Sequence, residues 1–191
     1  QRSHMNAILP LLLSAVIAHA MPARAQDTQP TQAAPAITTF PSLEVSRYMG
    51  KWYEIARFPN RFQRDCVSDT SATYSVLPDG RVSVVNRCRQ ADGSEKSAEG
   101  VARQLSGPTS PKLEVRFAPA ILSFIPMVWG DYWVIDLDPD YRLAAVSDRK
   151  GDYLWILSRT PTVDQAAYDA LVKRIAAQGL DAAKLQATPQ R

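Results

Sequence analysis

Histidine and cysteine, two residue types that commonly act in catalysis and metal binding, are scarce in this sequence of 191 residues. The two histidines, His4 and His19, both fall in an N-terminal segment that has the layout of a cleaved export signal. Removal of that segment would leave no histidine, which argues against Ser-His-Asp or Cys-His catalysis and against a histidine-bound zinc or haem. The sequence therefore predicts no metal and no cofactor.

The two cysteines, Cys66 and Cys88, have two conceivable roles. In an oxidising compartment, two cysteines of an exported chain more often form a disulfide than act as reactive thiols. Asp79 and Gly80 indicate a hairpin turn, which would bring the two cysteines to the same end of that hairpin. A disulfide is the preferred interpretation, and a thiol nucleophile is the lesser alternative.

The N-terminal residues have the composition of a processed leader. The run "QRSHM" is typical of a tag remnant or an upstream extension, and the apolar segment 7–20 is short for a membrane span. Small-x-small sites follow, so we assign 1–25 to an extension plus signal peptide and the polar segment 26–39 to a flexible leader. Because no cysteine follows the signal as a lipid attachment point, we expect an exported protein, in the periplasm or associated with the outer membrane, without a lipoprotein Cys.

The charge balance does not favour a nucleic-acid partner. The chain has 22 basic and 19 acidic residues, for a formal charge of +3. Arg2 and Arg24 lie in the segment 1–25, which has no acidic residue, so the remainder has 22 − 2 = 20 basic and 19 acidic residues, or +1. No long basic run is present, and we therefore expect no nucleic-acid binding.

The remaining residues predict one β-rich domain at 40–186 and a tail at 187–191. Eight segments are rich in aromatic and β-branched residues or alternate apolar with polar residues, namely 52–58, 69–77, 81–89, 95–105, 112–118, 131–137, 141–147 and 152–159. Strands joined by such tight turns predict an antiparallel sheet closed on itself, or a sandwich. A capping pattern at Thr162 and Gln165 then predicts an amphipathic helix over 163–178, ended by Gly179, with a last turn or strand at 180–185.

Three short motifs occur in order along this domain. They are Gly50-x-Trp52-Tyr53 at the first strand, "LDPDYRLAAVS" at 137–147 with Asp140, Tyr141 and Arg142, and Arg159 after the last strand. Together they resemble the signature of the lipocalins, and "GKWYEIARFPNRFQ" and "DYLWILSRTP" most resemble the bacterial outer-membrane lipocalin and its apolipoprotein D-like relatives. The resemblance covers about residues 40–186. It implies an all-β fold, an eight-stranded antiparallel up-and-down barrel with one C-terminal α-helix packed outside.

The resemblance also implies roles for the signature residues. In lipocalins the tryptophan fills the closed end of the barrel and the arginine of the last strand lies across it, which pairs Trp52 with Arg159 here. A cation over an indole face contributes roughly 0.5–2 kcal/mol, depending on burial. Gly50 would let the chain turn closely into its strand.

A barrel of this size holds one small ligand, and its strands send alternate residues inward. If Trp52 points inward, the same alternation places Glu54, Ala56 and Phe58 of its strand in the lining. Similar alternation on the later strands adds eight more lining residues. Plain core packing is the alternative for each of these predicted lining residues: Glu54, Ala56, Phe58, Tyr74, Val76, Val115, Phe117, Tyr132, Val134, Tyr153 and Trp155.

The segment 118–132 is too apolar for an ordinary surface loop. By the lipocalin topology it joins two strands at the open end of the barrel, together with a basic segment at 57–65 that contains Arg57, Arg61 and Arg64. A lid, a dimer contact and a membrane-touching loop are the three alternatives, and a solvated basic rim is the alternative to lipid docking. The apolar residues in question are Ile121, Leu122, Phe124, Ile125, Met127, Val128 and Trp129.

These observations favour a lipid-binding protein over an enzyme. We expect a fatty acid or lysophospholipid to be bound in the barrel and transported or stored in the bacterial cell envelope, with membrane contact and a homodimer as open alternatives. An isomerase-type enzyme would have to use Glu54, Asp136 or the tyrosines, and a carboxylate inside an apolar barrel would have a raised pKa. A scaffold that binds no ligand is the third hypothesis.

Overall fold

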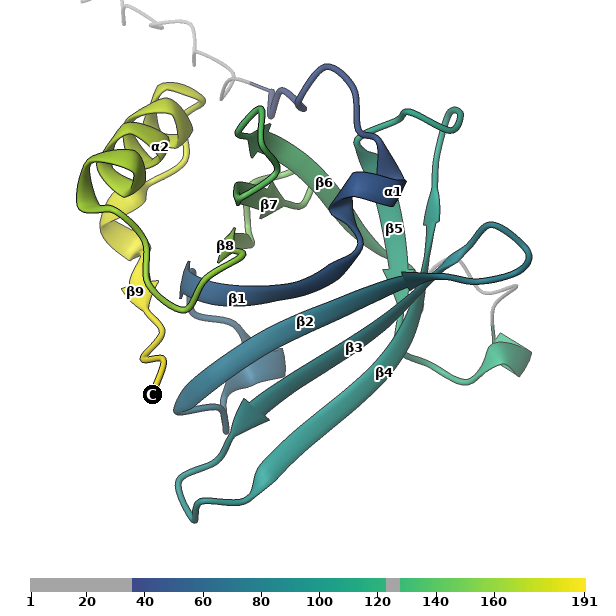
Figure 1. Ribbon diagram of the computed structural model, residues 1–191, viewed down its shortest axis with the longest axis horizontal. Coiled ribbons are helices and arrows are strands. Elements are labelled where there is room, and N and C mark those ends of the chain that lie inside the picture. Colours follow the sequence, from purple (N-terminus) through teal and green to yellow (C-terminus); the bar gives the residue numbers. More distant parts are fainter. Residues whose placement is uncertain (1–35, 123–127) are drawn as a thin grey trace, which may run out of the picture. The chain divides into compact units, whose positions relative to one another are not determined.

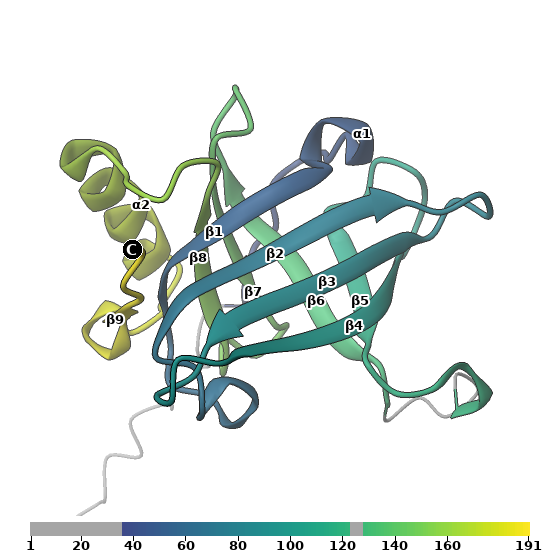
Figure 2. The ribbon, with the colours of Figure 1, turned by 60° about the horizontal axis from the view of Figure 1, so that its bottom comes forward.

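The computed structural model describes residues 36–122 and 128–191 of the chain, and these residues form a closed antiparallel β-barrel (Figures 1 and 2). Neighbouring strands pair in chain order, and β1 pairs with both β8 and β2, which closes the sheet. The strands are β1 (Gly50–Arg57), β2 (Ser68–Val76), β3 (Val82–Arg89), β4 (Glu95–Gln104), β5 (Lys112–Arg116), β6 (Gly130–Leu137), β7 (Leu143–Ser147) and β8 (Leu154–Ser158). The barrel predicted from the sequence is therefore confirmed, and the sandwich alternative is excluded.

The predicted segment 1–25 and most of the predicted leader lie outside the described residues. The short helix α1 (Val45–Tyr48) lies at one end of the barrel, just before β1 begins. We call this the closed end. The open end is opposite, where the loops 58–67, 90–94 and 148–153 join the strands, together with the described loop residues 117–122 and 128–129. The 3-10 helices η1 (Arg61–Gln63) and η2 (Ala120–Leu122) belong to two of these loops.

The helix α2 (Gln165–Ala177) lies outside the barrel beside β7 and β8 (Figure 1). Its buried residues Leu171 and Ile175 pack into an apolar cluster with the outward face of four strands, including Ile156 of β8. The predicted capping residue was wrong by two positions, because the Asp164 side chain, not Thr162, accepts the bond from the backbone N–H of Ala167 (3.0 Å). Gly179 has φ +87° and ends the helix as predicted.

A β-bulge in β1 changes which of its residues face the interior. Glu54 pairs with Leu157 of β8 but Ala56 pairs with Ile156, so Ile55 is the extra residue in the ladder. Trp52 and Glu54 face inward before the bulge, and Arg57 faces inward after it, opposite Trp155. One inserted residue therefore exchanges the two faces of the last part of the strand.

The C-terminal residues extend the wall of the barrel next to this bulge. The pairing of β1 with β2 covers only Gly50–Tyr53, and β9 (Gln186–Ala187) pairs with the continuation of β1 on the same edge. The Gln190 side chain then donates to the carbonyl of Glu54 (2.8 Å) and to that of Thr70 in β2 (2.9 Å). Residues 186–191 thus connect β1 and β2 where these two strands no longer pair.

Candidate ligand-binding site

The closed end of the barrel is built around Trp52, which is fully buried. The guanidinium carbon of Arg159 lies 4.0 Å from the centre of a Trp52 ring. The three guanidinium nitrogens of Arg159 donate to the carbonyls of Tyr141 (3.1 Å), Lys51 (3.1 Å) and Arg47 (2.8 Å). The charge is therefore stabilised by the indole face and by three backbone dipoles, which fixes Arg159 across the end of the barrel.

The other signature residues meet at the same place. Gly50 has φ +94°, and a Cβ atom there would lie 3.3 Å from the Arg159 guanidinium, so both the conformation and the space favour glycine. Tyr141 is buried, and its hydroxyl accepts from the backbone N–H of Glu44 (3.0 Å). Arg47 of α1 lies over the Tyr141 ring at 4.0 Å. Asp140 and Arg142, on either side of Tyr141, are exposed.

Three tyrosines form the floor of the interior above Trp52. The hydroxyls of Tyr48 and Tyr74 each lie 2.8 Å from the hydroxyl of Tyr132. Burial raises the pKa of Tyr74 to about 12 and raises the pKa of Tyr48 and Tyr132 well above the ordinary value. The floor is therefore a neutral, hydrogen-bonded cluster.

A small apolar cavity of ≈ 20 Å³ lies beside this cluster, next to Leu43, Val84 and Leu113 among others. That volume holds about one water molecule. This cavity is too small for an acyl chain.

The half of the interior nearer the open end is lined by small or partly exposed residues. The register of β3 with β4 places Val84 opposite Gly100 and Asn86 opposite Ala98, so Ala98 has an inward position. Ala98 is nevertheless exposed, because the pairing of β4 with β5 begins only at Val101 and leaves this part of the inner face open to solvent. The Phe117 ring lies over Gly100, where a Cβ atom would be 2.7 Å away from it, and is partly exposed at the open end.

Seven of the eleven predicted lining residues lie on the inner side of the barrel. Val134 and Tyr74 are buried in the inner core, Val115, Tyr132 and Trp155 pack against it, Glu54 is buried, and Tyr153 stacks on Trp155 (5.8 Å between ring centres). Phe117 is the eighth residue on this side. Contact of any of these residues with a ligand remains a prediction.

Three predicted positions are wrong. Ala56 and Phe58 belong to the outer apolar cluster under α2, because the bulge at Ile55 shifts the alternation that placed them inside. Val76 is 54% exposed, because it is the last residue of β2 and lies beside the turn to β3. Asp136, considered for acid–base chemistry, also lies outside, where Arg174 of α2 donates to its two carboxylate oxygens at 2.7 and 2.9 Å.

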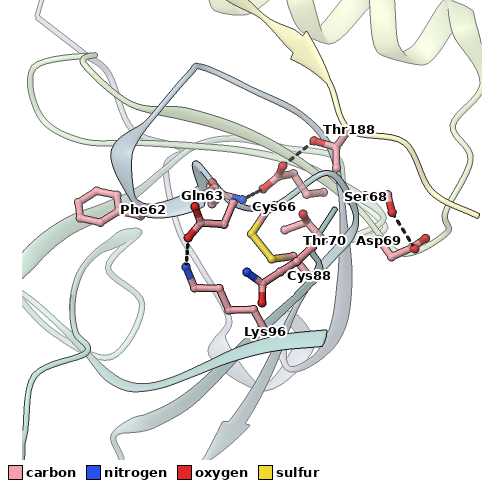
Figure 3. Close-up of a disulfide and its surroundings, with 12 residues drawn as sticks. Phe62, Gln63, Cys66, Ser68, Asp69, Thr70, Cys88, Lys96 and Thr188 are labelled. Carbon is pink, nitrogen blue, oxygen red and sulfur yellow. Dashed lines mark hydrogen bonds and ion pairs between the residues drawn. A yellow bond between two sulfur atoms is a disulfide. The ribbon is translucent and has the colours of Figure 1, made fainter. Parts of the chain in front are cut away.

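Glu54 is the buried carboxylate of the interior. Gln63 of η1 donates to its Oε2 and Thr188 donates to its Oε1, both at 2.5 Å (Figure 3). Burial raises the pKa of Glu54, although these two hydrogen bonds and the charge of Arg57 oppose the rise. The Oε1 atom of Gln63 also accepts from the indole N–H of Trp155 (2.8 Å), so the loop of η1 is fixed to the inner wall.

Arg57 is the cation of the interior, although the sequence pattern grouped it with the exposed basic segment 57–65. Its side chain is only 15% exposed, and its Nε lies 3.2 Å from Oε1 of Glu54. That Nε atom is buried without a hydrogen-bond partner. The interior thus combines an apolar wall with one carboxylate and one arginine near the open end.

The disulfide predicted from the sequence is present. Cys66 and Cys88 are joined with Cα atoms 5.5 Å apart, beside Gln63 and Thr70 (Figure 3). The bond ties the loop that contains η1 to the end of β3. No free cysteine remains, so the thiol-nucleophile alternative is excluded for this oxidised form.

The apolar loop is only partly described. Ile121 is 78% exposed, while Leu122, Val128 and Trp129 are half-buried. The guanidinium carbons of Arg103 and Arg116 lie 4.1 and 5.4 Å from the centre of the Trp129 ring. Phe124, Ile125 and Met127 lie outside the described residues, so the three alternatives for this loop stay open.

Sequence reasoning missed four residues of the open end. Thr188 and Gln190 reach Glu54 from a distant part of the chain and Gln63 reaches it from the following loop, and no local motif marks them. Arg57 could have been found only by locating the bulge. Within residues 36–122 and 128–191, no helix is long and apolar enough to cross a membrane, and no three His, Cys, Asp or Glu side chains form a group that could hold a metal ion.

Comparison with known proteins agrees with this architecture. Residues 43–190 match a family model described as a lipocalin-like domain. The chain is 45% identical over 150 residues to temperature-induced lipocalin-1 of Arabidopsis thaliana, which covers 78% of this chain and 80% of that protein. It is 36% identical over 178 residues to outer membrane lipoprotein Blc of Escherichia coli K12, and the aligned region covers 93% of this chain and 94% of that protein.

Among solved structures, the cockroach allergen Per a 4 superposes with a TM-score of 0.61 at 19% identity, covering 81% of this chain and 92% of that one. This likeness shows the same barrel fold. The family match and the two relatives confirm the resemblance to the bacterial outer-membrane lipocalin that the three sequence motifs indicated. The chain therefore belongs to the lipocalin family, whose members generally bind small hydrophobic ligands rather than catalyse reactions.

Proposed function

We propose that this lipocalin binds a single-chain lipid, a fatty acid or a lysophospholipid, inside the barrel and transports or stores it in the bacterial cell envelope. The observation that carries the proposal is the contrast along the interior. The closed end has a cavity of only ≈ 20 Å³, whereas inward positions nearer the open end, such as Ala98 and Phe117, are reached by solvent. An apolar interior with few polar groups suits an acyl chain with its head group near the opening.

The envelope location rests on the relative called outer membrane lipoprotein Blc, whose similarity covers 93% of this chain. The open end offers features that suit a lipid surface, since Phe62 is exposed beside the exposed cations Arg61 and Arg64, and Ile121 is exposed on another loop of the same end. Docking to anionic lipid would use both kinds of group. A homodimer through the same apolar residues is the competing use of this surface.

The enzyme alternative has less support. Glu54 is the inward carboxylate that it would need, and both of its oxygens accept hydrogen bonds from Gln63 and Thr188. Each oxygen is thus already engaged by a neutral donor, which reduces its basicity toward a substrate proton. The tyrosine floor is neutral, because burial raises the pKa values of its three hydroxyls.

The proposed function can be tested by filling the interior. Ala98→Trp would place an indole at an inward position that solvent reaches, whereas Ser97→Trp would place the same group on the outward face of the same strand. The measurement is native mass spectrometry of protein from the envelope fraction, with the bound species extracted and identified, and titration with oleate and lysophosphatidylethanolamine.

We expect wild type and Ser97→Trp to hold about one lipid per chain and Ala98→Trp to lose binding by at least about tenfold, because the indole occupies the volume of several methylene groups. Equal binding by all three proteins would place the lipid outside the barrel. If wild type neither contains lipid nor gains thermal stability from either lipid, the carrier proposal fails and the scaffold hypothesis gains support.

A further inference from the structure

Arg57 occupies an unusual position for an arginine of a β-strand. The bulge at Ile55 turns it to the inner face, opposite Trp155 of β8 and Gln186 of β9. Arginine is seldom buried without a partner, since removing its charge from water is costly. A specific reason is therefore needed for a cation on this wall.

Glu54 only partly satisfies this cation. The shortest contact is the 3.2 Å between Nε of Arg57 and Oε1 of Glu54, and it lacks hydrogen-bond geometry, since Nε is buried without a hydrogen-bond partner. The two carboxylate oxygens already accept from the neutral donors Thr188 and Gln63 at 2.5 Å. A guanidinium has five N–H donors. Within the part of the chain that the structure describes, no hydrogen-bond acceptor meets the Arg57 donors, so they are available to another group.

The surroundings restrict what that group can be. On one side of Arg57 are the Trp155 ring and the apolar inner core, and on the other is the loop of η1 at the open end. A chain that enters from the open end toward the tyrosine floor would leave its last atoms at the level of this arginine. Planar guanidinium donors match the paired oxygens of a carboxylate or a phosphate.

We propose that Arg57 binds the anionic head group of the lipid in the barrel, so that it selects a carboxylate or phosphate over a neutral head group. The inference rests on the proposed lipid-binding function and deepens it. Arg57 acts here as a specificity-determining residue, and Glu54, Gln63 and Thr188 position it by holding the inner wall and the η1 loop together.

The test uses three ligands with the same chain and different head groups, namely dodecanoate, dodecyl phosphate and dodecanol. Each displaces the neutral fluorescent probe N-phenyl-1-naphthylamine from the full chain, at a pH where dodecanoate is ionised. The proteins are wild type, Arg57→Gln, Arg57→Lys and Arg61→Gln. Arg61 is a matched control, because it is an exposed cation of the same open end and its guanidinium lies over Phe62 rather than inside the barrel.

We expect Arg57→Gln to weaken binding of at least one anionic ligand by roughly 10- to 100-fold, the value of hydrogen bonds to a charged group. Binding of dodecanol should change by less than about threefold, within the usual effect of a neutral exchange. Unchanged dodecanol binding also shows that the variant is folded. Arg57→Lys keeps the charge without the planar fork and should be intermediate.

The two anionic ligands separate the two sources of the head group. A loss for dodecanoate alone assigns a fatty acid, a loss for dodecyl phosphate alone assigns a phosphate lipid, and a loss for both makes Arg57 a general anion site. All three results support the inference.

Three other results would overturn it. If Arg57→Gln and Arg61→Gln weaken binding of the anionic ligands equally, the loss of affinity is a long-range effect of net charge. If Arg57→Gln weakens all three ligands equally, the residue supports the fold and does not select the head group. If it changes none of them, Arg57 does not contact the ligand, yet the lipid-binding function stands. Failure of wild type to bind any of the three would instead contradict the proposed function itself.

Discussion

The closed end and the open end of the barrel each hold a partly buried arginine, and the two arginines differ in their hydrogen bonds. At the closed end, all three guanidinium nitrogens of Arg159 donate to carbonyls and the group lies on Trp52. At the open end, Arg57 has one ionic contact, of 3.2 Å with Glu54, and a buried Nε atom without a hydrogen-bond partner. Since burial of polar groups is normally compensated by hydrogen bonds, the first arginine serves the fold and the second has donors left for a ligand.

The two ends also differ in how they are built. The closed end is formed by α1 and by the short connection between β6 and β7 that contains Tyr141. Trp52 and Tyr141 are buried there, and Arg159 donates to three backbone carbonyls. The open end is held by long-range connections, including a disulfide with a sequence separation of 22 and the side chains of Thr188 and Gln190. Substitutions at the closed end should therefore change stability, and those at the open end should change binding as well.

The largest expected effect is at Trp52. Trp52→Ala should lower the free energy of unfolding by about 3–5 kcal/mol, the usual cost of removing a fully buried aromatic side chain. Trp155→Ala is the matched variant at the open end, where the ring is half-buried, and should cost about 1–2 kcal/mol because less area is removed from the core. Denaturation in urea, followed by circular dichroism, measures both.

The two tryptophan variants should also differ in ligand affinity. Trp155→Ala should weaken lipid binding, because its ring faces the interior beside Arg57. Trp52→Ala, measured below its unfolding temperature, should leave affinity nearly unchanged, since the tyrosine floor separates it from the open half. A larger stability loss for Trp155→Ala than for Trp52→Ala would contradict the division between the two ends.

A smaller effect is expected from the disulfide. Replacing both Cys66 and Cys88 by serine should lower the free energy of unfolding by about 2–4 kcal/mol, since the unfolded chain loses a cross-link. Affinity for lipid should fall as well, because the bond fixes the loop that carries Gln63.

Reduction of wild type provides the control for this variant. A reductant should bring wild type to the stability of the double variant and leave the variant itself unchanged. If the stability of wild type does not change on reduction, the loop is held by its hydrogen bonds to Glu54 and Trp155, and the disulfide contributes little.

Sequence patterns anticipated the closed end much better than the open end. The aromatic pair at Trp52, the turn at Gly80 and the period of the C-terminal helix are local signals, and each leads to the observed element. Strict alternation predicted inward positions correctly at Glu54 but failed at Ala56. The bulge between them depends on how β1 pairs with β8. An isoleucine at position 55 gives no sign of that bulge in the sequence.

The same limit explains the residues that were missed. The hydrogen bonds of Glu54 join it to Gln63, nine residues away, and to Thr188, 134 residues away. The contact with Thr188 is a product of the closed barrel, and the contact with Gln63 depends on the fold of the loop that contains η1. A sequence can indicate that a cavity exists, but the residues that complete its polar rim become visible only when the strands and the C-terminal segment are placed together.

The smallest expected effect depends on pH and concerns Glu54. Burial raises the pKa of this carboxyl. A carboxyl whose pKa is higher in the folded chain holds its proton more tightly there, so it stabilises the fold at low pH. That contribution is lost as the pH rises from the ordinary carboxyl pKa, about 4.3, through the folded value.

Glu54→Gln isolates this contribution, because a glutamine can accept from Gln63 and donate to the Thr188 hydroxyl. At low pH the free energies of unfolding of wild type and variant should agree within about 1 kcal/mol, the net value of one hydrogen bond. As the pH rises through the window above, the variant should gain stability relative to wild type. Glu99→Gln, an exposed outward position on β4, corrects for the loss of one surface charge. If wild type instead gains stability relative to Glu54→Gln as the pH rises, the ion pair with Arg57 outweighs desolvation, and Arg57 then has less charge to offer an anionic ligand.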